Sequence, residues 1–536
     1  MIYYVDKQYN TYRHRDYEVT WDGFIYLPGY SSGENSIKEF LENVMKTSFS
    51  LASSLLQGQF FIVVKDVSNG KSYAFVDSSG TFHAYHSETC LSASFLELVR
   101  HEKLRFSDSN PRSIAEFLHW GNLHKNRTCF DRVKKLLGKD IFCLSEDGNI
   151  DWIEKKNHSI KDNPPFSFQE SMEQLHASTK ESFLSIDITG GVDSRLLLGA
   201  LDYYGSNYEL AISGPAGHDD VEYAKSIASY LGKKLLITEQ DVTSSLQKEI
   251  DDIFEISDGL LDISSYHRIY QHQKNRAQMG YDLTISGAGG EIYKEFSWLH
   301  DFPFYHKSAP NWERFYQLRF CPIAPDHSLF TDHFRISSEN IKTFVMNEFN
   351  SFKHKWNSQA YDETYFTYKW PSFLGRFITN NNHYVPCYAP YMELNRAQFS
   401  YHLKRRERMF NFMHRDLLSF YNPHLSKMPT TEGRMGLSTQ PLELVKDAGK
   451  FVANRSQRLL NKISQKAFKK SFMSLQSPNH PDYIQKLRSL SSFSSGIQRL
   501  KEEGVLHPDL IQENVSDRYV GRIIGLYKFI EFLDDN

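Results

Sequence analysis

Between residues 183 and 286 the chain alternates short apolar runs with longer segments of helical character. The expected strands are 183–188, 208–213, 235–238 and 281–286, and the expected helices are 195–204, 219–231 and 244–257. Strands that alternate with helices over connections of this length form a parallel sheet with helices on both faces. We therefore predict a doubly wound α/β domain, in which ligands bind at the carboxyl ends of the strands.

The segments on either side of this region have different patterns. Two hairpins are expected before it, one from 58–66 and 72–77 and one from 141–144 and 150–152, whereas the chain beyond 300 is aromatic-rich and mostly helical. The polar stretch 155–167, which contains Pro164 and Pro165, is the best candidate for a linker. Because 536 residues exceed one hydrophobic core, we predict two domains, 1–165 and 166–536.

A glycine-rich turn follows the first predicted strand of the parallel sheet. Its residues are Thr189, Gly190, Gly191, Val192, Asp193 and Ser194, and a predicted helix comes directly after them. Glycines allow backbone N–H groups to approach an anion, and the helix N-terminus adds its partial positive charge. The hydroxyl groups can donate to phosphate oxygens, and Asp193 can hold a magnesium ion. The pattern S/T-G-G-x-D-S therefore predicts a pyrophosphate-binding loop, and it differs from a Walker A loop, which needs Gly-Lys-Ser/Thr.

This pattern matches the pyrophosphate-binding loop of N-type ATP pyrophosphatases, and the chain resembles the asparagine synthetase family. Further resembling segments are 56–61 (L-x-G-x-F-A), 77–80 (D-R-x-G), 121–137 (G-Y-x-x-x-x-R-T-I-F-x-x-I-K-K-L-P), 285–291 (S-G-x-G-G-D-E), 389–393 (V-P-F-L-D) and 434–437 (K-x-G-F). The resemblance extends from about residue 55 to about residue 440.

The resemblance implies an α+β Ntn-hydrolase-like sandwich, then a synthetase domain with an adenine-nucleotide-hydrolase-like sheet, and a helical C-terminal extension. It implies a ligase that transfers AMP from ATP to a carboxylate, releases pyrophosphate, and lets ammonia or another amine displace AMP. The loop 189–194, together with Ser286 and Gly287, would bind ATP. Asp193 and Glu291 would hold Mg²⁺, and Arg434 would be the catalytic residue that stabilises the adenylated intermediate or the state after attack.

Four positions depart from the family pattern. Ile2 stands where the glutamine-hydrolysing members need a cysteine nucleophile, so we expect the glutaminase activity to be lost. Ala288 replaces an acidic residue near the amino-acid substrate, which argues against aspartate as the acceptor. Glu291 replaces an aspartate, and Arg434 replaces a lysine that could donate a proton.

These departures leave several functions open. The favoured one is an amide-forming ligase acting on a small-molecule or saccharide carboxylate, in surface-polysaccharide or natural-product biosynthesis. The alternatives are a catalytically impaired nucleotide-binding scaffold and an ammonia-dependent asparagine synthetase. A net charge of -3 argues against a nucleic-acid partner, and no apolar run is long enough for an integral membrane segment. The five cysteines are expected to be free thiols, with cytoplasm as the default location, and a homodimer is one oligomeric state left open.

Two other groups of polar residues have plainer explanations. Asp219, Asp220 and Glu222 follow the second strand of the parallel sheet, near where the family binds the nucleotide base, but a capping box at a helix start explains them. His83 and His86 could form a metal pair, although no ligand cluster accompanies them in the sequence, so packing or surface roles are favoured.

Overall fold

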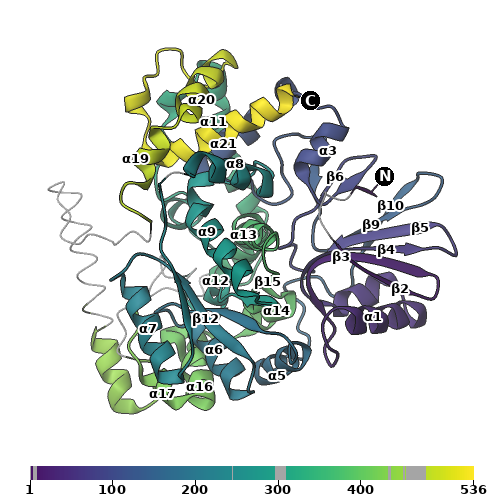
Figure 1. Ribbon diagram of the computed structural model, residues 1–536, viewed down its shortest axis with the longest axis vertical. Coiled ribbons are helices and arrows are strands. Elements are labelled where there is room, and N and C mark those ends of the chain that lie inside the picture. Colours follow the sequence, from purple (N-terminus) through teal and green to yellow (C-terminus); the bar gives the residue numbers. More distant parts are fainter. Residues whose placement is uncertain are drawn as a thin grey trace.

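The computed structural model describes residues 2–3, 9–243, 245–295, 298, 309–431, 436–450, 453 and 479–535. Within these ranges the chain forms three β-sheets, and helices dominate beyond the third of them (Figure 1). Two sheets belong to the N-terminal part, and the third is a parallel sheet in the middle of the chain. This confirms the predicted α/β class with a parallel sheet and a helical C-terminal region.

The N-terminal part is built on an antiparallel sheet with the strand order β10-β9-β5-β4-β3-β2. Its strands are β2 (Asn10–His14), β3 (Tyr17–Tyr26), β4 (Gln57–Asp66), β5 (Lys71–Val76), β9 (Asp140–Leu144) and β10 (Ile150–Glu154). Both predicted hairpins are confirmed, since β4 pairs with β5 and β9 with β10. The helices α1 (Glu34–Lys46) and α2 (Phe49–Ala52) contribute to the apolar core on one face of this sheet.

A smaller sheet accompanies it, with the order β1-β7-β6-β8. Its strands are β1 (Ile2–Tyr3), β6 (Tyr85–His86), β7 (Leu91–Ser92) and β8 (Lys134–Lys135). The helices α3 (Phe95–His101) and α4 (Pro111–Trp120) lie between β7 and β8 in the sequence. Leu91 and Leu136 share an apolar cluster with Phe61 and Phe142, so the two N-terminal sheets pack together through side chains.

The third sheet has the order β13-β12-β11-β14-β15, with every neighbouring pair parallel. The strands are β11 (Leu184–Asp187), β12 (Tyr208–Ser213), β13 (Leu235–Thr238), β14 (Leu283–Ile285) and β15 (Cys387–Tyr388). The helices before and between them are α5 (Phe168–Ser178), α6 (Asp193–Tyr203), α7 (Asp219–Leu231), α8 (Leu246–Ile256) and α9 (Ile263–Met279). The chain winds outward from β11 to β13 and then returns to place β14 on the other side of β11, so the strand order reverses at β11.

The two faces of the parallel sheet differ in polarity. Leu184 and Ile186 of β11 share an apolar core with α5, α6 and α7. Since side chains alternate along a strand, Ser185 and Asp187 point to the opposite face, where Asp187 forms an ion pair with Arg276 of α9. The helix α9 thus covers a polar face of the sheet, while α6 and α7 cover the apolar face.

The helix α9 is absent from the sequence prediction, which passed from the helix at 244–257 directly to the next strand. It is delimited by Asp262, whose side chain accepts a hydrogen bond from the Ser264 amide, and by Gly280, which has a φ of 74°. Another correction concerns α7: its N-cap is His218, which accepts from the Asp220 amide, rather than a capping box that begins at Asp219.

The remaining helices surround the sheet and connect it to the N-terminal part. They are α10 (Trp312–Phe315), α11 (Asp332–Asn350), α12 (Asn357–Thr364), α13 (Gly375–Asn381), α14 (Leu394–His402), α15 (Arg405–Arg408), α16 (Phe412–Tyr421), α17 (Pro423–Lys427), α19 (Tyr483–Arg488), α20 (Ser491–Glu502) and α21 (Asp517–Asp534). The last of them, α21, packs against both α4 and α9. One apolar core therefore includes Phe95, Tyr266 and Phe529, so the C-terminal helices pack on both sides of the predicted boundary near 165.

All five cysteines are free and buried, as the sequence predicted. His83 is also buried, with its Nε2 bonded to the Pro371 carbonyl, which agrees with a packing role. Across the part of the chain that the structure describes, none of the helices combines the length and the apolar character that crossing a bilayer requires.

Candidate functional site

The predicted pyrophosphate loop joins the carboxyl end of β11 to the first turn of α6. Its turn is held by short-range hydrogen bonds: the Thr189 amide donates to Ser194 Oγ at 3.2 Å, and the Gly191 amide donates to Thr189 Oγ1 at 3.1 Å. Val192 anchors the loop, because its side chain is fully buried in the core beneath the sheet. The loop therefore presents Thr189, which is exposed, and the partly exposed Gly191 at the end of the sheet.

A second glycine-rich turn lies directly against this loop. A methyl group on Gly287 would come within 2.9 Å of the Ser194 backbone, and one on Gly290 would come within 2.5 Å of Asp193. Glycine is thus required at 287 by the close approach of the Ser194 backbone and at 290 by the Asp193 side chain. The structure brings the two predicted segments, 189–194 and 286–287, together at the point where the strand order reverses.

The two oxygens of the Asp193 carboxylate are each bonded to a basic side chain. Lys294 Nζ lies 2.7 Å from Oδ2, and His414 Nε2 lies 2.8 Å from Oδ1. Burial raises the pKa of Asp193, but the Lys294 ammonium and His414 outweigh that effect and lower the pKa to about 2. Asp193 is therefore ionised and paired at neutral pH.

The predicted magnesium ligands both contact neighbouring side chains. Asp193 is paired as described, and Glu291 accepts a hydrogen bond of 2.9 Å from the Tyr365 hydroxyl group. In the described part of the chain, no group of three potential metal ligands lies at this end of the sheet. The predicted role of these two carboxylates as magnesium ligands stays a prediction. Arg434, the predicted catalytic residue, lies outside the described residues.

A cavity of about 630 Å³ opens beside the two glycine turns. Asp187, Thr189, Gly191, Asp193 and Ser194 line it on one side, and Ser286, Gly287 and Ala288 line it on the next. A volume of several hundred Å³ is typical of small-molecule sites. One face of the helix α9 forms the opposite wall. The residues of α9 that line it are Ser265, Arg268, Ile269, His272, Gln273 and Arg276. These positions recur at the helical spacing, so one stripe of α9 faces the cavity.

Three side chains of this stripe are deeply buried and incompletely paired. Arg276 is fully buried, and only its Nη2 is bonded, to Asp187. Its Nε and Nη1 have no partner, and neither do His272 Nε2 and Gln273 Oε1. Buried polar atoms are almost always hydrogen-bonded in folded proteins, and a polar ligand that reached these four atoms would supply partners that the described chain does not.

The α9 side of the wall is cationic at neutral pH. Burial and the neighbouring Arg276 and Arg268 lower the pKa of His272 well below its usual range, so this imidazole is neutral. The positive charge comes from Arg276 and from Arg268, which donates to the Ser213 carbonyl at 2.7 Å. Asp187 compensates one of these charges and Asp220, which also lines the cavity, opposes the other, so the guanidinium groups offer an anionic ligand local donors and no net charge.

One backbone amide of the loop already binds a carboxylate. The Gly190 amide donates to Asp220 Oδ1 at 2.9 Å, and Asp220 lies in the first turn of α7. The sequence explained Asp220 as part of a helix start, whereas the structure shows that it also contacts the loop. The amide therefore has the orientation needed to bind an anion, and Asp220 competes for it.

Arg195 supports the loop from behind. It is fully buried, and it donates to the carbonyl oxygens of Met428 and Pro429 at 2.7 and 3.0 Å. No local pattern predicts this role, because the acceptors are backbone atoms more than two hundred residues away. The cationic stripe of α9 was missed for a different reason, since the helix that carries it was not predicted.

Comparison with known proteins does not add to the geometry: no protein-family model matches the chain, and no curated protein matches it either.

Proposed function

We propose that this chain is an ATP-dependent ligase that adenylates a carboxylate and transfers ammonia or another amine to it. The observation that carries the proposal is the cavity between the diglycine loop and the cationic stripe of α9, with its unpaired Arg276, His272 and Gln273 atoms. A nucleotide offers what this cavity lacks, namely several anionic oxygens and a polar base. The resemblance of 189–194 to the pyrophosphate loop selects ATP among such ligands.

The proposed reaction has two steps. The acceptor carboxylate attacks the α-phosphorus of ATP and forms an acyl adenylate, with pyrophosphate as the leaving group. Ammonia then attacks the acyl carbon, an amide forms, AMP leaves, and one proton is released. In this scheme the hydroxyl groups of Thr189 and Ser194 bind the pyrophosphate oxygens, and Arg276 and Arg268 stabilise the charge that develops on phosphorus.

Magnesium enters the proposal only as the ion that ATP carries on its phosphates. Because Asp193 is paired with Lys294 and His414, we assign no step to a protein-held magnesium ion. Lys294 pairs with the Asp193 carboxylate and does not line the cavity, so we assign it the role of holding Asp193 in place.

The acceptor we propose is a small-molecule or saccharide carboxylate other than aspartate. Ala288 lines the cavity with a methyl group, which cannot bind the ammonium group of an amino acid. Free ammonia is the simplest amine donor, since the chain has Ile2 where a glutaminase needs its nucleophile.

The test combines binding with turnover. Full-length protein is titrated with MgATP in a calorimeter, and pyrophosphate release is then measured with ammonium and a panel of uronic acids, aspartate included. We expect ATP binding, and pyrophosphate release that needs a uronic acid. Arg276→Lys keeps the charge beside Asp187 but loses the guanidinium fork, so the Kd for ATP should rise about tenfold. Gln278→Ala, on the exposed end of α9, is the matched control and should bind ATP normally.

A second function is favoured by the pairing of Asp193. A carboxylate whose charge is already compensated by Lys294 and His414 attracts a metal ion less strongly, which suits a nucleotide-binding scaffold without turnover. ATP binding that Arg276→Lys weakens, without pyrophosphate release for any carboxylate, would favour this scaffold. Absence of ATP binding by the folded protein would refute both functions.

A further inference from the structure

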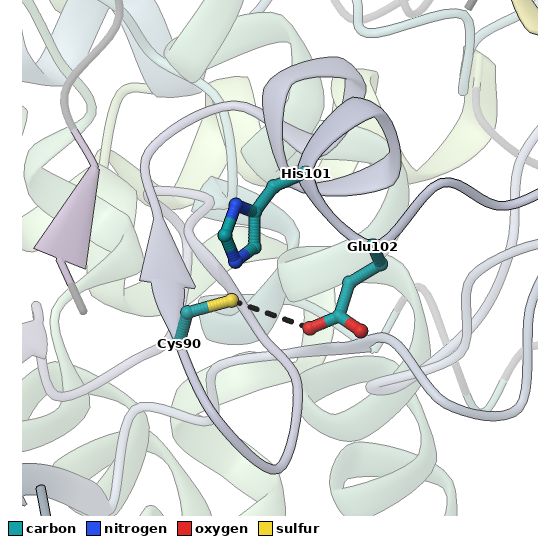
Figure 2. Close-up of side chains that lie close together, drawn as sticks. All are labelled: Cys90, His101 and Glu102. Atoms are coloured by element: carbon teal, nitrogen blue, oxygen red, sulfur yellow. Dashed lines mark hydrogen bonds between the residues drawn. The ribbon is translucent and has the colours of Figure 1, made fainter.

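A cysteine, a histidine and a glutamate meet in the N-terminal part, in a group that shares no residue with the cavity beside the diglycine loop. Cys90 directly precedes β7, His101 is the last residue of α3, and Glu102 follows it (Figure 2). The Cys90 Sγ, a ring nitrogen of His101 and a carboxylate oxygen of Glu102 all lie within 4.8 Å of one another. A sulfur, a nitrogen and an oxygen atom from two segments of the chain thus lie close together.

The carboxylate in this group is held in place by its neighbours. Ser87 Oγ donates to Glu102 Oε1 at 2.6 Å, Thr89 Oγ1 donates to the same oxygen at 3.1 Å, and Cys90 Sγ lies 3.4 Å from it. The turn that carries Cys90 is itself closed by a hydrogen bond of 2.8 Å from the Ser87 amide to the Cys90 carbonyl. Hydroxyl groups that orient a carboxylate in this way are typical of the supports around metal ligands.

We propose that Cys90, His101 and Glu102 form a binding site for Zn²⁺. A thiolate, an imidazole and a carboxylate are the ligands that zinc takes in proteins, whereas Mg²⁺ and Ca²⁺ prefer sets made of oxygen alone. Three protein ligands leave the fourth tetrahedral position to water. On binding, Zn²⁺ forms a bond to Cys90 Sγ, loses bound water molecules, and the thiol proton passes to the solvent.

The burial of the three residues suits such a site. Cys90 is fully buried at the base, Glu102 is partly buried, and His101 is exposed at the rim. The ion can therefore enter from solvent past His101, and water can complete its coordination. Figure 2 shows the His101 ring and the Glu102 carboxylate next to the Cys90 sulfur, with the hydrogen bond between Cys90 and Glu102 drawn as a dashed line.

The site has a structural role in the N-terminal part. Leu91, next to Cys90, pairs with Ile2 of β1, and α3 contributes Phe95 to the core that it shares with the C-terminal helices. A metal ion that joins Cys90 to the end of α3 therefore ties the β1–β7 pair to that core. The site lies in the part of the chain where the family resemblance would place a glutaminase, and it does not depend on the proposed ligase activity.

The experiment uses the full-length protein after treatment with a chelator and gel filtration, without nucleotide. Zinc is titrated in a calorimeter, and Co²⁺ is added separately as a spectroscopic probe, since a cobalt–thiolate bond gives a charge-transfer band in the near ultraviolet. We expect one Zn²⁺ per chain and a cobalt band that added Zn²⁺ removes. Cys90→Ser should abolish the band, and His101→Gln and Glu102→Gln should each raise the Kd for Zn²⁺ at least tenfold.

The control is Cys143→Ser, which removes another buried thiol that lies in β9 and leaves the three ligands intact. It should keep both the stoichiometry and the cobalt band. If Cys90→Ser does not fold, His101→Gln decides the matter, because its side chain is exposed at a helix end. Wild-type affinity in His101→Gln, or a wild-type protein that binds no zinc, would overturn the proposal.

Discussion

At the scale of single residues, the hydrogen bonds around Asp193 bear most directly on the stability of the site. Both of its carboxylate oxygens are bonded to basic side chains, and the Tyr391 hydroxyl group donates to its carbonyl at 3.0 Å. A buried ion pair adds little net stability over an apolar pair, but removing one partner leaves an uncompensated charge. Asp193 is thus a fixed part of the folded site, and its ionisation is coupled to folding.

Replacing Lys294 by methionine tests this coupling through pH. The pKa of Asp193 is about 2 in the folded state and 3.8 in the unfolded state. The ionised carboxylate therefore stabilises the fold fully above pH 3.8, and this stabilisation is lost as the pH falls towards 2. Lys294→Met should therefore lower the free energy of unfolding by about 2 kcal/mol at neutral pH, and by less as the pH drops below 4.

Urea unfolding at a series of pH values between 7 and 3 measures this difference. The control is Lys225→Met, which removes an exposed ion pair with Glu222 and should change stability little at any pH. A loss in Lys294→Met that stays the same across the whole series would contradict the assignment of the effect to Asp193.

At the scale of elements, the sequence predicted the parts of the site that have local patterns. The strand, glycine turn and helix around 184–203 follow from an apolar run, two glycines and a helical segment, all of which lie close together in the sequence. The helix α9 was missed although Asp262 and Gly280 delimit it and neither glycine nor proline interrupts 263–279. Its apolar stripe is short, with Ile263, Tyr266 and Tyr270 in the core, and the other buried side chains of the helix, among them His267, His272 and Arg276, are polar and obscure the apolar period in the sequence.

The face of α9 that lines the cavity can be blocked by one substitution. Ile269 lies in the middle of that face and is only partly buried, so a tryptophan there has room to extend into the cavity. Ile269→Trp should weaken ATP binding at least tenfold and leave the far-ultraviolet circular dichroism unchanged, because the backbone of α9 is not disturbed.

Gln278→Trp adds the same ring on the exposed end of α9 and is the matched control for this substitution. It should bind ATP like the wild type in the calorimeter. Equal ATP affinities for the two tryptophan variants would show that the nucleotide does not occupy this cavity.

At the scale of the whole molecule, the N-terminal part and the parallel sheet are joined by buried polar contacts. The Gly58 amide donates to Glu393 Oε1 at 2.7 Å, and the Ala389 amide donates to Gln59 Oε1 at 2.7 Å. The sequence predicted both β4 and the segment 389–393 as separate motifs, but not their contact, because they lie more than three hundred residues apart. Patterns of polarity and spacing describe an element and its neighbours in sequence, whereas this interface depends on the final packing.

Glu393 makes the stability of this interface depend on pH. Burial raises its pKa from 4.5 to about 8, although the Gly58 amide and Arg396 act in the opposite direction. Because the pKa is higher in the folded state, the contribution of Glu393 to the free energy of unfolding is fully present below pH 4.5 and is lost as the pH rises through 8. Glu393→Gln keeps an acceptor for the Gly58 amide and stays neutral, so its free energy of unfolding should lie within about 1 kcal/mol of the wild-type value near pH 5 and exceed it by about 5 kcal/mol near pH 9. Chemical denaturation at both pH values measures this difference in the free energy of unfolding, with the exposed Glu181→Gln as the control.

A stability difference between Glu393→Gln and the wild type that is the same at pH 5 and pH 9 would mean that the Glu393 carboxyl group ionises normally. The N-terminal part and the parallel sheet would then be joined across an interface that admits water.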